Sequence, residues 1–338
     1  MADWIGFAGL CAVVAAGLFM AYVALRELGW IPALPRPSRA SVQVALALVG
    51  SRVLQLTLLL LFCHFWHPTA SFWAWSTFWQ PMSPVQSVLA TQALFLLNNL
   101  CYLSAGYLLW RHIRQTDVQA ARWALAAYIV LPQGWLTMLP GVQGMTLLLG
   151  LVCYLLLRQK RLPWAALALS AAVMLDARLI YLWPLLLFVE ARGRFSVRSL
   201  ALALPPVALV AVCLGGLQAW PLPVWGRLSL QALSADPAKA LLLIAVLAGA
   251  LTALVLAAYP VRQDRLWALW CVVYGGLPLV SSVLMPLILW PVAMGVGLLP
   301  HKGMRTAFVL VCLGLCGLWT VAAANGQMLP ALVRGWSM

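Results

Sequence analysis

The sequence predicts an all-α fold: a polytopic integral membrane helix bundle with about 10 to 12 transmembrane helices. The 338 residues are 64% hydrophobic and only 8% charged, with a mean hydropathy of +0.97, whereas an ordinary soluble domain is about 25% charged. Apolar runs also follow one another along the whole chain. Because one soluble core cannot hide this much apolar surface, the composition excludes a soluble enzyme, a disordered chain and a secreted disulfide scaffold.

Each predicted helix is an apolar run, and most of the runs end beside a charged, Gly or Pro residue. Several runs, notably 142–157 and those directly after it, are short for a spanning helix of about 20 residues, so we expect them to be tilted, broken or re-entrant. No linker or soluble segment interrupts the series, which indicates a single integral membrane domain over residues 1–338. The predicted helices are 4–25, 41–63, 87–110, 121–139, 142–157, 162–175, 177–190, 198–217, 238–259, 266–284, 286–300 and 306–324.

The basic residues mark one face of the predicted bundle. Sixteen of the 21 Lys and Arg fall in alternate loops, against 7 acids in the whole chain. By the positive-inside rule these loops are cytoplasmic, both termini are periplasmic, and the net charge of +14 needs no nucleic-acid partner. The Ala-, Leu-, Trp- and Arg-rich usage favours a bacterial inner membrane protein, with the endoplasmic reticulum membrane as the alternative location. The sixteen are Arg26, Arg36, Arg39, Arg111, Arg114, Arg122, Arg158, Lys160, Arg161, Arg192, Arg194, Arg198, Arg262, Arg265, Lys302 and Arg305.

The few acids can be weighed one by one. Asp117 lies in an Arg-rich loop, where an ion pair is expected, and Asp264 lies at a helix end beside Arg262 and Arg265. Asp176 stands apart, because it lies at the outer end of a helix pair and two residues before Arg178. An ionisable group at membrane depth is a functional candidate. The two side chains either form a structural pair or contact a substrate.

Arg52 is the second unusual residue, since it lies well inside the apolar run 41–63. An arginine at this depth must find a carboxylate, a carbonyl or a phosphate, unless it snorkels toward the cytoplasm. Its planar guanidinium is well suited to a phosphate.

The first outer loop, 64–84, is rich in tryptophan and contains no acid. Trp75 and Trp79 belong either to an interfacial aromatic belt or to a platform for a lipid or a sugar ring. His64 and His67 are three residues apart, but two histidines without a carboxylate make a poor metal site. We therefore expect headgroup contacts and no metal. No nucleotide-binding fingerprint, metalloprotease motif or nucleophile elbow occurs, so no cofactor is expected.

Residues 42–194 resemble the PIG-V (Gpi18-like) branch of the GT-C glycosyltransferases. The likeness lies in the order and spacing of Gly50-Ser51-Arg52, Leu96–Arg114, Leu131-Pro132, the basic turn 158–161, Asp176-Ala177-Arg178 and Trp183-Pro184. It implies a GT-C-like fold and transfer of mannose from a polyprenyl-phosphate carrier to an acceptor at the non-cytoplasmic face. It also implies Asp176 as the catalytic carboxylate, Arg52 and Arg178 as phosphate or substrate contacts, and Trp75 and Trp79 as platforms.

Two departures from that family weaken the catalytic interpretation. Ser76 stands where the family carries the aspartate of a W-D-x-x-W type motif, and Gln143 or Gly144 stands where it carries a glutamate. A serine is no general base at neutral pH without an activating group. The alternative is a non-catalytic GT-C-derived subunit that binds a lipid-linked glycan or scaffolds a partner membrane or periplasmic enzyme. Small-residue surfaces at Gly295 and Gly297 and at Gly314 and Gly317 suit such contacts. A transporter or flippase is the third hypothesis.

Overall fold

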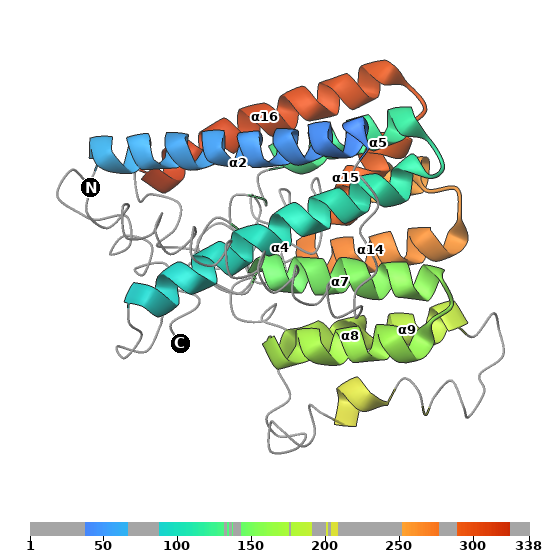
Figure 1. Cartoon of the computed structure of the whole chain (residues 1–338). Coiled ribbons are helices and arrows are strands. Elements are labelled where there is room, and N and C mark those ends of the chain that lie inside the picture. Colours follow the sequence, from blue (N-terminus) through green and yellow to red (C-terminus); the bar gives the residue numbers. More distant parts are fainter. Residues whose placement is uncertain are drawn as a thin grey trace, which may run out of the picture.

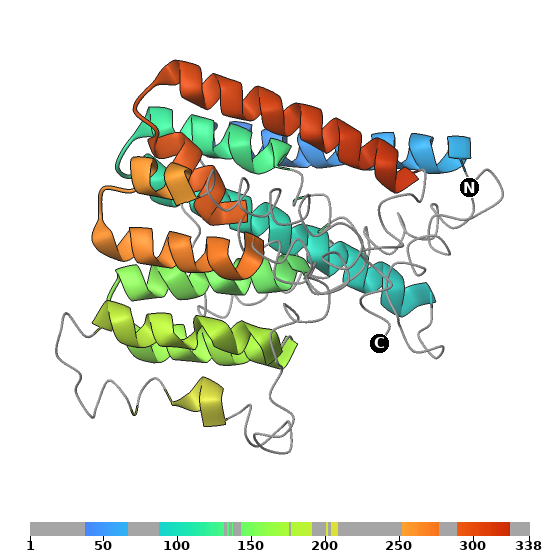
Figure 2. The same ribbon diagram turned by 180° about the vertical axis from the view of Figure 1, so that it is seen from behind.

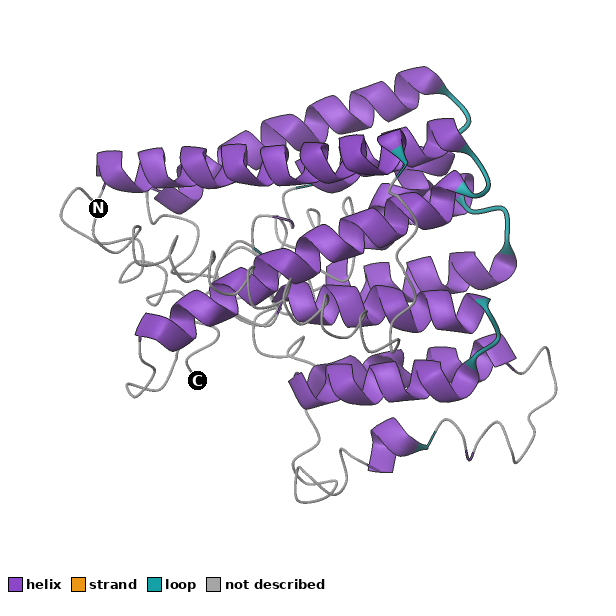
Figure 3. Cartoon of the chain, in the orientation of Figure 1, coloured by secondary structure: helices purple, strands orange, loops and turns teal. Residues whose placement is uncertain are grey.

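The structure is a computed structural model of the chain that describes residues 38–66, 88–131, 134, 137, 143–175, 177–190, 201, 204–208, 252–276 and 289–324. Every regular element in these ranges is a helix, and none of them is a strand (Figure 3). The all-α prediction is therefore confirmed for this part of the chain. Two of its helices are long and apolar enough to cross a membrane, over Arg39–Leu58 and Gln92–Arg114.

The helices follow the predicted apolar runs closely. The predictions 4–25, 198–217 and 238–259 lie outside the described residues, apart from 201, 204–208 and 252–259. The observed helices are α2 (Arg39–Trp66), α4 (Val88–Arg114), α5 (Val118–Val130), α7 (Gln143–Arg158), α8 (Leu162–Leu175), the 3-10 helix η1 (Ala177–Leu182), α9 (Trp183–Glu190), α14 (Arg262–Gly276), α15 (Leu289–Leu298) and α16 (Lys302–Ala324).

Helix α5 is shorter than the predicted 121–139 and begins earlier. The Asp117 carboxylate caps its first turn by accepting a 2.7 Å hydrogen bond from the Gln119 N–H. The helix ends at Val130 because Leu131 precedes Pro132 and is extended, with ψ 127°. The ion pair expected for Asp117 does not occur among the described residues, so its role there is capping.

The predicted helix 177–190 is a 3-10 helix followed by the α-helix α9. Pro184 explains the change, because a proline inside an α-helix lacks the N–H for the bond to the residue four positions earlier. Starting the α-helix at Trp183 places Pro184 in its first turn, where no such bond is required.

The helices lie side by side in a bundle, with α2 and α16 along one edge and α8 and α9 along the other (Figures 1 and 2). Helices α5 and α15 pack closely against each other, and Ala120 and Ala124 of α5 are buried. A Cβ on Gly297 would lie 2.5 Å from the Ala120 carbonyl oxygen, so only glycine permits this approach. The small-residue surface proposed for a partner at Gly297 is thus used inside the chain, while Gly314 faces open space.

The α4–α5, α7–α8 and α15–α16 connections all lie at one end of the bundle (Figures 1 and 3). Side-chain contacts join neighbouring helices there, including an edge-on ring contact at 6.1 Å between His112 of α4 and Tyr154 of α7. We call this the basic end, because the connections and adjoining turns carry Arg111, Arg114, Arg122, Arg158, Lys160, Arg161, Lys302 and Arg305.

The outer helices expose large apolar side chains. On α2, Leu46, Leu54 and Leu61 are each at least 60% exposed, and on α16 Leu310 and Val311 are similarly exposed. An amphipathic surface helix in water carries polar groups on its outer face. These helices are apolar on the inner and the outer face, which is the pattern of a helix that contacts lipid.

Candidate functional site

Arg52 is the centre of a buried polar cluster between α2, α4 and the segment after α5. Its side chain is 3% exposed. The Nε–H donates to Asn99 Oδ1 at 2.7 Å, and Nη1 donates to the Gly134 carbonyl at 2.9 Å and to Gln55 Oε1 at 3.2 Å. Nη2 donates to Thr137 Oγ1. The guanidinium therefore finds a carbonyl, as one of the predicted options stated, and it does not snorkel.

The charge of Arg52 is met by neutral groups. Its Cζ lies 4.0 Å above the centre of the Tyr102 ring, which adds a cation–π contact. No carboxylate of the described residues forms an ion pair with it. Four hydrogen bonds leave one of the five guanidinium N–H groups, on Nη2, without a partner in the described part of the chain. Within the described residues the positive charge of Arg52 is thus paired with no anion, a state that favours binding of one.

Asn98 joins this cluster to the start of α7. Its Nδ2 donates to the Thr137 carbonyl at 3.0 Å, and its Oδ1 accepts a very short hydrogen bond from the Gly144 N–H. A Cβ on Gly144 would lie 2.1 Å from the Asn98 carbonyl oxygen, so glycine is required here. The two asparagines of α4 therefore hold Arg52 on one side and the N-terminus of α7 on the other.

Gln143, the first residue of α7, lies next to this contact. It is 5% exposed, and its Oε1 has no hydrogen-bond partner within the described residues. An unpaired buried acceptor costs about 1–3 kcal/mol, so few buried polar groups are left in this state.

The cluster lies toward the end of the bundle opposite the basic end. Helix α5 starts at the basic end and runs 13 residues, about 20 Å, before the chain reaches Gly134 and Thr137. Tyr102 and Tyr128 close the side nearer the basic end, each donating its hydroxyl to the other's backbone carbonyl, at 3.2 and 2.7 Å. An apolar groove of about 410 Å³ lies on the same two long helices, lined by Ala45, Leu48, Val49, Leu103, Ser104, Tyr107 and Leu108.

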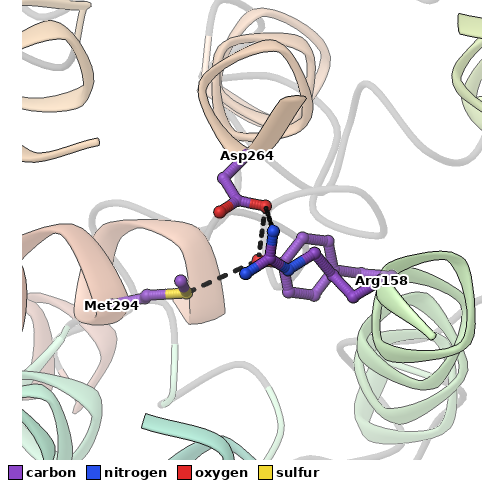
Figure 4. A network of polar contacts seen from close by, with 4 residues as sticks. Arg158, Asp264 and Met294 are labelled. Atoms are coloured by element: carbon purple, nitrogen blue, oxygen red, sulfur yellow. Dashed lines mark hydrogen bonds and ion pairs between the residues drawn. The ribbon is translucent and has the colours of Figure 1, made fainter. Parts of the chain in front are cut away.

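A second polar network occupies the basic end. Arg158 of α7 pairs with Asp264 of α14, with 3.4 Å between Nη1 and Oδ1 (Figure 4). The Tyr154 hydroxyl donates to the same carboxylate oxygen at 3.1 Å and lies 4.0 Å from the Met294 sulfur. Asp264 therefore pairs with Arg158, which comes from a helix far away in the chain, and Arg265 beside it donates instead to the Tyr259 carbonyl. Since Tyr154 also stacks on Trp290 at 4.5 Å, this network ties α7, α14 and α15 together.

Of the predicted site residues, Arg52 is the centre of the buried cluster, and Gln143 is a buried neighbour of the Asn98–Gly144 contact beside it. His64 lies on α2 and Arg178 on η1, but their side chains are outside the described part of the structure. Asp176, His67, Trp75, Ser76 and Trp79 fall outside the described residues altogether.

Sequence reasoning missed the partners of Arg52. Asn98 and Asn99 form a polar pair in the middle of an apolar helix, and this pair is a usable signal because a buried amide needs partners. Thr137 carried no such signal, since its place next to Arg52 depends on the path of the chain after α5.

Comparison with protein-family models, with curated proteins and with solved structures gives no match for this chain.

Proposed function

We propose that this chain is a polytopic integral membrane protein of the GT-C-like type that binds a polyprenyl-phosphate-linked sugar. Its site is the Arg52 cluster, in the half of the membrane away from the cytoplasm. The observation that carries the proposal is the buried guanidinium with neutral partners and a spare N–H. A phosphate supplies the missing negative charge and the missing acceptor in one group.

The membrane assignment is supported by the apolar outer faces of α2 and α16 and by the gathering of basic connections at one end. Under the positive-inside rule the basic end is cytoplasmic. The Arg52 cluster then lies in the non-cytoplasmic half, and the apolar groove beside α2 and α4 suits a hydrocarbon chain. We propose a bacterial inner membrane location with both termini periplasmic.

The proposed reaction is glycosyl transfer of the mannosyl type. An acceptor hydroxyl attacks the anomeric carbon, and the lipid phosphate leaves with the electrons of the broken bond. Asp176 is the proposed base that takes the hydroxyl proton, with Arg178 as a second substrate contact and with Trp75 and Trp79 as platforms. His64, His67 and Ser76 complete the proposed outer surface.

A non-catalytic GT-C-derived subunit is the second candidate. The observation that favours it is the absence of any carboxylate from the buried cluster in the described residues. Such a subunit would bind the lipid-linked glycan, or hold a partner membrane or periplasmic enzyme, without transferring sugar.

One experiment separates the two candidates. Purified full-length protein is incubated with radiolabelled polyprenyl-phosphate mannose or glucose and with candidate acceptors. Transfer that is lost in Asp176→Asn and retained in Ser76→Ala supports the enzyme. Binding of the lipid without turnover supports the lipid-binding subunit, and co-purification of a membrane or periplasmic enzyme without turnover supports the scaffold. Failure to bind the lipid refutes the enzyme and the lipid-binding subunit. Solute uptake by proteoliposomes would instead favour a transporter.

A further inference from the structure

Among the described residues, the Oε1 atom of Gln143 is the one buried side-chain oxygen that has no hydrogen-bond partner. Two neighbouring hydrogen-bond donors are already paired with other groups. The Gly144 N–H donates to Asn98 Oδ1, and the Thr146 hydroxyl donates to the Gln143 backbone carbonyl at 2.9 Å. Thr146 and Leu147, three and four residues further along α7, are fully buried, so Gln143 lies on the buried face of this helix.

The chemistry of the free atom limits what can bind it. An amide oxygen accepts hydrogen bonds, so phosphate and carboxylate oxygens, which are acceptors as well, do not satisfy it. A hydroxyl group does, because it donates to the oxygen and can also accept from the adjacent amide N–H₂. The position at the N-terminus of the 16-residue helix α7 adds backbone N–H groups and a partial positive charge, which favour a hydroxyl oxygen.

We propose that Gln143 forms a subsite for a hydroxyl group of the sugar, next to and distinct from the phosphate contact at Arg52. This inference rests on the proposed function. Asn98 connects the two subsites, since it binds the Thr137 carbonyl on the Arg52 side and the Gly144 N–H on the Gln143 side. A sugar phosphate offers both required groups at once, an anion for the guanidinium and a neutral hydroxyl for the amide.

The test compares two lipids that differ only in the sugar. Full-length protein in nanodiscs is titrated with polyprenyl phosphate and with polyprenyl-phosphate mannose. The variants are Gln143→Met, which keeps the length of the side chain, and Gln143→Leu. The matched control is Gln92→Leu, which removes a different buried glutamine that lies on α4.

We expect both Gln143 variants to bind the glycosylated lipid about tenfold more weakly, because this change corresponds to the loss of one hydrogen bond. Their affinity for polyprenyl phosphate should stay within about twofold of wild type, and Gln92→Leu should change neither affinity. If the Gln143 variants lose affinity equally for both lipids, or lose it for neither, the subsite is overturned. Loss of folding in both variants also overturns it, because the amide would then be structural. If the wild-type protein binds neither lipid, the proposed function itself fails, and this result is distinct from a loss of discrimination.

Discussion

The Nε–H of Arg52 on α2 donates to the Oδ1 of Asn99 on α4 at 2.7 Å, and both side chains are buried. Asn99 is itself oriented by a 2.8 Å bond from its Nδ2 to the Phe95 carbonyl. Within the described residues, this pair links the two helices that are long and apolar enough to cross a membrane. The first prediction follows from it.

Asn99→Leu alone should destabilise the protein by about 1.5–3 kcal/mol, because it leaves a charged donor buried without its acceptor. The double variant Arg52→Met/Asn99→Leu should lose less than the sum of the two single variants. SDS-induced unfolding in mixed micelles measures both. Thr57→Val, which removes an exposed hydroxyl from the same helix, is the control. Purely additive losses would mean that the two side chains do not interact.

Gly144→Ala and Gly50→Ala should change the free energy of unfolding in opposite directions. At Gly144 a Cβ would lie 2.1 Å from the Asn98 carbonyl oxygen, so α7 must move away from α4 and the free energy of unfolding should fall by several kcal/mol, about 3 or more. At Gly50 a Cβ meets nothing within 4 Å, so alanine should stabilise α2 by about 0.5–1 kcal/mol. The same unfolding measurement applies, and similar effects at the two sites would contradict the α4–α7 contact.

Lys160→Gly should stabilise the turn between α7 and α8. Lys160 has φ 59°, and the Arg161 N–H donates to the Leu156 carbonyl at 2.9 Å, which is the bonding pattern of a Schellman motif. Glycine adopts this backbone conformation without steric cost, so we expect a gain of about 0.5–1 kcal/mol. Gln159→Gly, one residue earlier, should be destabilising instead. A loss of stability in Lys160→Gly would rule out this turn.

Asp264→Ala and Asp264→Asn separate the two bonds of the basic-end network. Alanine leaves the buried Tyr154 hydroxyl without its acceptor and should cost about 1–3 kcal/mol. Asparagine keeps an acceptor and loses only the pair with Arg158, whose side chain is 36% exposed, so it should cost less than about 1 kcal/mol. Equal losses would mean that the charge, and not the hydrogen bond, holds α7 to α14.

Cysteines placed at the basic end test whether this end of the bundle faces the cytoplasm. Gln115→Cys lies in the α4–α5 connection, and Lys302→Cys lies at the first residue of α16, directly after the α15–α16 connection. Both should resist a membrane-impermeant maleimide added to intact cells and react after the membrane is opened, because basic loops stay in the cytoplasm. Labelling of either cysteine in intact cells would reverse the proposed topology.

The sequence predicted the helices well because their signal is local. Apolar runs of the right length lie between polar turns, and α7 and α8 begin and end within one residue of their predicted bounds. The errors have equally local causes, namely the cap at Asp117, the extended residue before Pro132 and the proline that starts α9.

The site was less accessible to sequence reasoning. Arg52 and Gln143 stood out because a charged residue in an apolar helix and a glutamine in place of a family glutamate are visible in the sequence. Their partners were not, because the contacts with Asn99, Gly134 and Thr137 join residues 47 to 85 positions apart. The same holds for Arg158 and Asp264, which come from helices far apart in the chain.

The most direct test of the account is photo-crosslinking of the full-length protein with a photoreactive polyprenyl-phosphate sugar, mapped by mass spectrometry. We predict labelled peptides from α2, α4 and the start of α7. This labelling should be competed by polyprenyl phosphate, strongly reduced in Arg52→Met and partly retained in Arg52→Lys, which keeps the charge but not the planar donor group. Labelling elsewhere, or labelling that Arg52→Met leaves unchanged in a folded protein, would contradict the proposal that Arg52 holds the lipid phosphate.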